Sequence, residues 1–272
     1  LQELNFVIDE NQGEYDLSED PIEAFNKSNA KRGKEVIWQA LYYDETSGFT
    51  PARLAHMSKA DYNAKNGGRN PWRRSTRTHI MIAYSAAKKM GWMDENLDET
   101  EEAQKDKRYP QLYYRFEALP EGWDNPESEQ YLENPDETYY ETRYSDWDKP
   151  TLFGDKYFRG ANGRKTNVPV IRLAELYLTR SIIRYKSGNM QGARRDLNRV
   201  RERAGLEELT GDLTEEVIHI ERMKELAWEG DRIYYLIGLE KDLPPGDRNM
   251  DVLSYPYELY FPIPFREQDF YQ

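Results

Sequence analysis

The stretch that decides the fold is residues 167–232, NVPVIRLAELYLTRSIIRYKSGNMQGARRDLNRVRERAGLEELTGDLTEEVIHIERMKELAWEGDR. Its pattern predicts three amphipathic helices in a row. The first is expected to begin at Val168, because Pro169 suits a first helical turn, where its missing N–H is not needed. It runs to about Lys186. Ser187-Gly188-Asn189 ends it, since glycine takes the left-handed turn at a helix end without steric cost.

The next two helices follow from apolar spacing and from their caps. The second carries one continuous apolar stripe at the helical period and closes at Gly205; the stripe comprises Met190, Ala193, Leu197, Val200 and Ala204. The third is expected to begin near Thr214, a suitable N-cap, and to run to Arg232. Its end carries a dense set of charged residues.

Two antiparallel helices joined by a Gly-Asn turn are typical of a tetratricopeptide-type unit, which normally stacks on neighbouring units. The sequence shows no second clear copy. We therefore predict a mostly α fold, with a tetratricopeptide-like helical core, long irregular loops and a few short strands.

Composition narrows the classes of function. The chain has 272 residues, of which 38% are hydrophobic and 32% charged, and no apolar run is long enough for a transmembrane helix. A net charge of −12 argues against binding to nucleic acid, which needs basic patches. The arginines of the second helix are interpreted as a solvated face; they are Arg194, Arg195, Arg199, Arg201 and Arg203. The absence of cysteine excludes disulfides, zinc–thiolate sites and cysteine nucleophiles.

The rest of the chain predicts short elements among loops. Asp20-Pro21-Ile22-Glu23 indicates a helix start with a capping box. Residues 35–43 predict a strand covered on both faces. A helix is expected over residues 78–90, and short strands over residues 112–116 and 153–158. Residues 257–264 predict an extended segment that can pair with the strand at 35–43 as an edge strand.

Four motifs in order carry a resemblance to a known family. Residues 169–175 resemble P-x-x-R-x-A-E, and residues 197–206 match L-N-x-V-R-x-R-A-G-L. Residues 221–232 match E-R-x-x-E-L-x-x-E-G-x-R, and residues 262–264 match a terminal P-I-P. Residues 35–38 and 106–108 fit a strand and a D-x-R of the same family. Together they resemble the C-terminal half of the SusD/RagB family.

The resemblance implies a function at the outer membrane of Gram-negative bacteria. Members are surface-exposed lipoproteins that bind glycans, or in some cases peptides, so the resemblance implies capture of an oligosaccharide or polysaccharide for delivery to a SusC-like TonB-dependent transporter. Binding without catalysis, and without a cofactor, is expected. The chain lacks the lipidated N-terminal cysteine and the N-terminal helices of the family, so we expect a fragment: one domain over 1–272, with a variable loop-rich region at 30–160 and a helical core with the P-I-P segment at 165–265. Tyr235-Leu236-Ile237-Gly238 replaces the family's usual Asp-Leu-Arg run.

The charged set on the helices is interpreted as a structural network. It comprises Arg172, Glu175, Glu221, Arg222, Glu225, Glu229 and Arg232. Arg172 and Glu175 are one turn apart and are expected to pair. Alternating charges on successive turns of one helix usually satisfy one another. The alternative is the acid and base of a glycoside hydrolase, which needs two carboxyls facing across a cleft.

Other chemistries find little support in the sequence. His56, His79 and His219 are too scattered for a metal triad. Residues 94–102 are acidic but lack the spacing of a calcium loop. Phosphate-binding glycine loops, serine nucleophile elbows and H-E-x-x-H motifs are missing from the sequence.

Aromatic residues in irregular segments are the remaining candidates for ligand contact. The C–H faces of sugars stack on aromatic rings while neighbouring polar groups bond the hydroxyls. The candidates for glycan binding are Phe49, Trp72, Trp123, Tyr139, Tyr140 and Trp147. Packing within the loops is the competing interpretation for each of them. Trp38, Trp92 and Trp228 lie in predicted regular elements and are expected in the core. A peptide- or protein-binding helical scaffold remains an alternative function.

Overall fold

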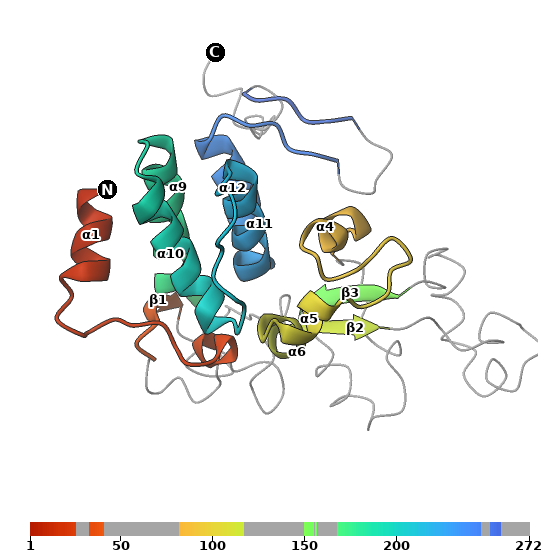
Figure 1. Cartoon of the computed structure of the whole chain (residues 1–272), viewed down its shortest axis with the longest axis horizontal. Helices are drawn as coiled ribbons and strands as arrows, with labels where there is room; N and C mark the ends of the chain where they lie inside the picture. Colours follow the sequence, from red (N-terminus) through yellow and green to blue (C-terminus); the bar gives the residue numbers. More distant parts are fainter. Residues whose placement is uncertain are drawn as a thin grey trace, which may run out of the picture.

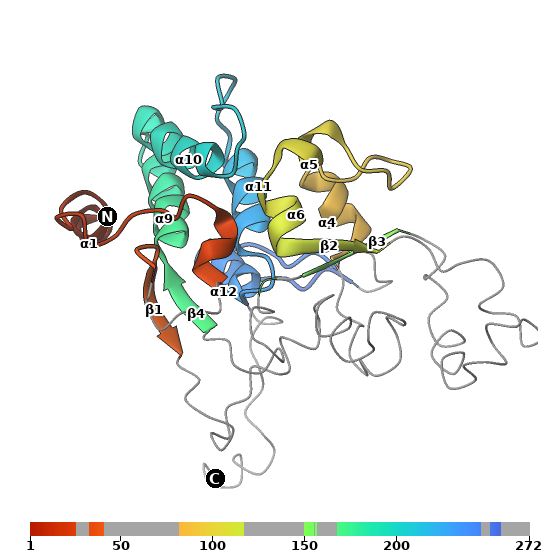
Figure 2. The same ribbon diagram turned by 90° about the horizontal axis from the view of Figure 1, so that it is seen from below.

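The computed structural model describes residues 1–25, 33–40, 82–116, 150–154, 156, 168–245 and 251–256. Helices α9 to α12 lie in the middle, with α1 on one side and α4 to α6 with strands β2 and β3 on the other (Figures 1 and 2). The fold is mostly helical. The elements are α1 Gln2–Asp9, η1 Pro21–Phe25, β1 Val36–Ala40, α4 Tyr84–Lys89, α5 Glu101–Lys105, α6 Arg108–Leu112, β2 Tyr113–Phe116, β3 Thr151–Gly154, β4 Val168–Arg172, α9 Leu173–Lys186, α10 Met190–Arg203, α11 Glu215–Leu226 and α12 Asp231–Gly238.

The antiparallel pair α9 and α10 forms as the sequence predicts. Gly188 takes a positive φ of 82° at the end of α9, and the Asn189 side chain accepts a hydrogen bond from the Gly192 N–H at the start of α10. Leu178 and Leu197 are fully buried where the two helices meet, in a cluster that also includes Ile218 of α11. The apolar stripe of the second helix therefore faces the core.

The predicted start of the first helix, at Val168, is wrong. Val168–Arg172 is a strand that pairs antiparallel with β1, with Arg172 opposite Val36 and Pro169 opposite Gln39. Three of its five residues are β-branched, which favours a strand. Arg172 keeps an extended backbone as the N-cap, so α9 begins only at Leu173.

The third predicted helix is also shorter than expected. It begins as predicted, because the Thr214 side chain accepts a hydrogen bond from the Val217 N–H, but it ends at Leu226. Trp228 and Gly230 have positive φ values of 73° and 78°, and α12 then starts afresh at Asp231. Residues 229 and 232 therefore do not continue the face of α11.

The elements around α4 differ in detail from the prediction. In the described part, the helix expected from residue 78 begins at Tyr84, because Ile82 forms an extended bridge to Leu152. Strand β2 is confirmed and pairs antiparallel with β3, which starts at Thr151 rather than at Phe153. Helices α5 and α6 were not predicted, since their stretch is acidic and short of aliphatic residues. Thr100 caps α5 by accepting from the Ala103 N–H.

The N-terminal region contains two short helices. Helix α1 was not predicted and packs against α9. The helix start at Asp20-Pro21 is confirmed, although the turn that follows is a 3-10 helix rather than an α-helix. The expected extended segment at 257–264 lies outside the described residues. Within the described part, no helix has both the length and the apolar character needed to cross a bilayer.

The tryptophans occupy different environments. Trp92 is fully buried in the core cluster around α4 to α6, as expected. Trp228 is partly buried and packs against the same cluster. Trp38 is 60% exposed, so its assignment to the core is wrong. In the described part, β1 has β4 as its partner, and this two-stranded sheet turns Val36 inward and leaves Trp38 facing outward.

Candidate functional site

Glu225 on α11 is the centre of a buried ionic network. Its Oε1 accepts hydrogen bonds from Arg172 Nη1 at 2.9 Å and from Arg203 Nη2 at 2.5 Å. Its Oε2 lies 3.4 Å from Arg108 Nη1. All of these side chains are at most 3% exposed. Guanidiniums from β4, α6 and α10 thus converge on one carboxylate.

Arg172 connects that centre to two further acids. Its Nη1 donates to Glu35 Oε1 at 2.6 Å, and its Nε and Nη2 form a fork on Glu229, each at 2.8 Å. The predicted pair between Arg172 and Glu175 is wrong, because the guanidinium is already engaged by these carboxylates. Arg172 lies at the end of a strand rather than on the helix that carries Glu175, which explains the error.

The network also contains residues that the motif analysis did not assign to it. Asp106 accepts a fork from Arg108 Nε and Nη2, both at 2.8 Å, so the D-x-R motif is part of the frame. Lys156 donates to the Glu229 carboxylate at 2.8 Å and to the Glu225 carbonyl at 2.7 Å. Glu221, which belongs to the predicted set, lies 2.7 Å from Arg108. Lys156 sits in a segment without a motif, so no sequence signal could have identified it.

The electrostatics of the network keep its acids ionised. Burial alone would raise the pKa of Glu225, but Arg203, Arg172 and Arg108 outweigh it and hold that pKa far below its usual range. Burial would likewise raise the pKa of Glu229, but Arg172 and Lys156 outweigh it, so that this pKa is also lowered. A general acid needs a raised pKa and access to a substrate. The pKa values of Glu225 and Glu229 are lowered rather than raised, and Glu225 is fully buried. Their surroundings therefore fit a structural role.

The other members of the predicted set lie in different surroundings. Arg222 forms a fork on Asp231 at 2.8 and 2.5 Å and lies 3.7 Å from Glu175. Arg232, on α12, has no hydrogen bond or ion pair to any described residue, and its Nη1 is buried. The single network expected from sequence is therefore divided into two parts, the buried centre and a cluster around Arg222. Arg232 belongs to neither of them.

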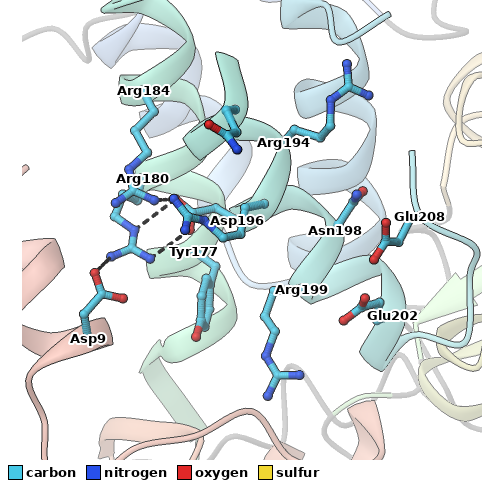
Figure 3. Close-up of a pocket in the computed structure, with 12 residues that line it drawn as sticks. Asp9, Tyr177, Arg180, Arg184, Arg194, Asp196, Asn198, Arg199, Glu202 and Glu208 are labelled. Atoms are coloured by element: carbon cyan, nitrogen blue, oxygen red, sulfur yellow. Dashed lines mark hydrogen bonds and ion pairs between the residues drawn. The ribbon is translucent and has the colours of Figure 1, made fainter. Parts of the chain in front are cut away.

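A polar groove of about 580 Å³ lies along α9 and α10 beside α1. In Figure 3, Arg180 and Arg184 converge on Asp196, while Asp9 reaches Arg180 from α1. The bonds from Arg180 Nε and Nη2 to Asp196 are 2.9 and 2.8 Å. Arg194 donates to backbone carbonyls at 2.8 and 2.6 Å. The groove thus offers fixed donors and acceptors for a polar ligand.

The other end of the polar groove is acidic. Glu202 and Glu208 lie side by side there (Figure 3), and the hydrogen bond between them raises the pKa of Glu202. The prediction that the arginines of α10 form one solvated face is wrong. Arg195 is exposed, whereas Arg203 points into the core and binds Glu225.

Histidine and acidic clusters give no metal site in the described residues, where no group of three potential ligands occurs. His219 is buried and bonds Tyr235 at 2.7 Å and Glu215 at 3.2 Å. Burial lowers the pKa of His219 despite the nearby Glu215. Asp94 Oδ1 accepts from the N–H groups of Asn96 and Asp98, which closes a local turn. His56 and His79 lie outside the described residues.

The aromatic candidates for glycan contact all lie outside the described residues: Phe49, Trp72, Trp123, Tyr139, Tyr140 and Trp147. The structure therefore neither brings them together nor separates them. Trp38 is the exposed aromatic that sequence analysis placed in the core. It lies on β1, just before the segment that carries Phe49, and Val170 of β4 is also exposed.

Solved structures with the same fold are several. A SusD superfamily protein from Bacteroides thetaiotaomicron VPI-5482 is 17% identical, with a TM-score of 0.62 over 98% of this chain and 53% of that one. A SusD superfamily protein from Bacteroides vulgatus ATCC 8482 is 18% identical, with a TM-score of 0.56 over 98% and 55%. Surface glycan-binding protein A from Bacteroides thetaiotaomicron, in complex with laminarihexaose, is 20% identical, with a TM-score of 0.55 over 100% and 57%.

This chain spans little more than half the length of those structures. No curated protein matches it. The sequence model of the SusD family (SusD/RagB) matches residues 11–237, which include the buried ionic network and the lining of the polar groove apart from Asp9. The chain belongs to the SusD family.

Proposed function

We propose that this protein captures an oligosaccharide or polysaccharide at the bacterial outer-membrane surface without catalysing a reaction. The observation that carries the proposal is the match to the SusD family over residues 11–237. One solved structure with the same fold is a surface glycan-binding protein in complex with laminarihexaose. The ionised, shielded carboxylates around Glu225 agree with a binding role, since they do not fit an acid–base pair.

The ligand contacts are assigned to aromatic side chains in the variable region. Residues 41–81 and 117–149 carry the candidates. The first of these segments follows β1 and precedes Ile82, and the second lies between β2 and β3. A pyranose ring stacks on an indole or phenol ring and buries apolar area, while nearby polar side chains bond its hydroxyls. The exposed indole of Trp38 is a further candidate.

The captured glycan would pass to a SusC-like TonB-dependent transporter, with this protein as a surface lipoprotein beside it. Co-purification tests this part of the proposal. The protein, co-expressed with a SusC-like transporter of the same bacterium, should be recovered with it in one detergent-solubilised complex. Recovery of the two proteins in separate fractions would argue against delivery while leaving glycan binding in place.

Calorimetry with laminarihexaose and a panel of other oligosaccharides tests the binding function. We expect saturable binding of at least one glycan, and a loss of about ten-fold or more in affinity when Trp72 or Trp123 is replaced by alanine. An aromatic ring contributes the apolar area that it buries and about 0.5–1.5 kcal/mol beyond it. Tyr234→Ala is the matched control, because Tyr234 is an exposed aromatic on α12. A panel without any binding would contradict the proposal.

The polar groove favours a second candidate, a peptide-binding scaffold. Its fixed guanidiniums and carboxylates can bond main-chain and side-chain groups of an extended peptide. A peptide library measured beside the glycan panel separates the two. Binding of peptides but of no sugar would replace the glycan proposal. Release of reducing sugar by the pure protein, abolished in a Glu→Gln variant, would instead revive a glycoside hydrolase.

A further inference from the structure

A second groove, distinct from the polar one, lies between α4 and the α11–α12 corner. Its volume is about 750 Å³, which is within the range of small-molecule sites. Its walls are mainly apolar and include Ala86, Met90, Met223, Leu226, Ile233 and Pro244. We call it the apolar groove. Walls of this kind provide a binding surface for the hydrocarbon part of a ligand.

Arg232 lines the apolar groove, and its charge has no partner among the described residues. Its Nη1 is buried without an acceptor, and no described residue forms a hydrogen bond or an ion pair with it. The nearby acids are engaged elsewhere: Asp231 is held by Arg222, and Glu216 lies 2.6 Å from Lys89. Arg232 thus differs from Arg172, which is surrounded by carboxylates.

The surroundings of Arg232 affect its pKa accordingly. Burial lowers the pKa of Arg232 from its ordinary value, and the opposing effects of Tyr235, Glu216 and Asp231 do not offset this. In contrast, acids raise the pKa of Arg172 despite its burial. Shielding a guanidinium from water without a counter-charge costs free energy. A bound carboxylate would remove that cost through charge-assisted hydrogen bonds.

We propose that the apolar groove is a second ligand site, which takes a small monocarboxylate with an apolar body whose carboxylate pairs with Arg232. Arg232, which has no partner among the described residues, sets the charge of the ligand, and the walls set its apolar body. A peptide is a poorer occupant, because its amide groups need partners. Two consecutive wall residues, Pro244 and Pro245, have no N–H to offer. The site is independent of the glycan contacts.

Octanoate and octanamide are the probes for a direct test, because they share the apolar body and differ in charge. Titration of the full chain, followed by calorimetry and by NMR chemical shifts, should give saturable octanoate binding that is at least about ten-fold tighter than octanamide binding. Equal affinities for the two probes would overturn the proposal, as would the absence of octanoate binding. This comparison uses the unaltered protein and so does not depend on the folding of any variant.

Substitutions then locate the site. Arg232→Met should remove the preference for octanoate, and Ala86→Trp, which fills the groove, should weaken both probes. Arg232→Lys should keep part of the preference. Arg195→Met is the matched control, since Arg195 is exposed on α10 and has no described partner. Octanoate binding that survives Arg232→Met in a folded protein would overturn the assignment.

Two further measurements distinguish a small monocarboxylate from a peptide as the occupant of the apolar groove, and distinguish this site from the glycan site. A short peptide with a hydrophobic C-terminus, such as N-acetyl-Phe-Leu, should bind more weakly than octanoate. If it binds more tightly, a peptide carboxylate is the occupant and the proposal is wrong. Glycan affinity should not change in Arg232→Met. A protein that binds octanoate but no glycan would contradict the proposed function while supporting this site.

Discussion

At Glu225 a buried carboxylate meets the guanidiniums of Arg108, Arg172 and Arg203, and the energetics of such a site are asymmetric. Desolvation of the charges cancels much of their mutual attraction, so the intact cluster contributes little net stability. Removal of one member has a much larger effect, because the remaining charges stay buried without compensation. The loss of stability on substitution therefore depends on which buried charges are left without a counter-charge.

Replacing Glu225 by glutamine tests this asymmetry with almost no change in shape. We expect the free energy of unfolding to fall by about 3–5 kcal/mol, because three guanidiniums lose their shared counter-charge. Urea denaturation followed by circular dichroism measures the change. Glu216→Gln is the control, since its ion pair with Lys89 is about half exposed and should contribute less than about 1 kcal/mol. If the two substitutions lower the free energy of unfolding equally, the Glu225 charge is not needed to compensate the buried guanidiniums.

The same carboxylates predict how stability depends on pH. The pKa values of Asp106, Glu225 and Glu229 are lowered in the folded protein, where burial is outweighed by arginine and lysine neighbours. Groups with a depressed folded pKa contribute stability above their unfolded pKa, and that stability is lost as the pH falls through the folded value. The contribution of these carboxylates to the free energy of unfolding should therefore be constant near neutral pH and fall steadily below the ordinary glutamate pKa of 4.5. Denaturation at a series of pH values measures it, and constant stability down to pH 3 would contradict the network.

At the scale of elements, local patterns predicted α10 and the cap of α11, but long-range pairing decided other boundaries. Pro169 suits both the first turn of a helix and an edge strand, and only the antiparallel contact with β1 makes Val168–Arg172 a strand. The end of α11 at Leu226 likewise has no stop signal such as proline. There the chain turns so that Trp228 packs on the core cluster and on Gly154, which is remote in sequence.

Gly154 of β3 gives an element-scale prediction, because a Cβ at this position would lie 2.6 Å from the Trp228 ring. Such a distance is too short for ordinary packing, and neither the ring nor the paired strand can move freely. Gly154→Ala should therefore destabilise the protein by about 1–3 kcal/mol. Thermal unfolding measures the effect. Gly211→Ala is the matched control, since a Cβ there meets nothing within 4 Å.

A double substitution then shows whether the ring is the cause. Gly154→Ala combined with Trp228→Leu should lose less stability than the sum of the two single changes, because the smaller side chain leaves space for the new methyl group. Additive losses would mean that the alanine acts through the backbone of β3 instead.

At the scale of the whole molecule, motifs predicted the family and most of the charged residues, but not which of them meet. Glu35, Lys156 and Glu229 come together through Arg172 although they are far apart in the sequence. Charge alternation along a helix indicates that acids and bases are present, yet it contains no information on contacts between elements. For the same reason, Arg232 looked equivalent to Arg172 in sequence, and only the fold shows that one is partnered and the other is not.

The buried network also links elements across the molecule, so its loss should be felt far from Glu225. Ion pairs and hydrogen bonds from α11 reach α6, α10, the end of β4 and Lys156, and Arg172 continues the connection to Glu35 beside β1. In native-state hydrogen exchange, Glu225→Gln should therefore raise exchange in these elements together, because they open as one cooperative unit. Asn189→Ala provides the comparison, since loss of that N-cap removes one hydrogen bond at the start of α10 and should raise exchange mainly there. Faster exchange confined to α11 in Glu225→Gln would mean that the ionic contacts are local and that apolar packing alone couples the two sides of the molecule.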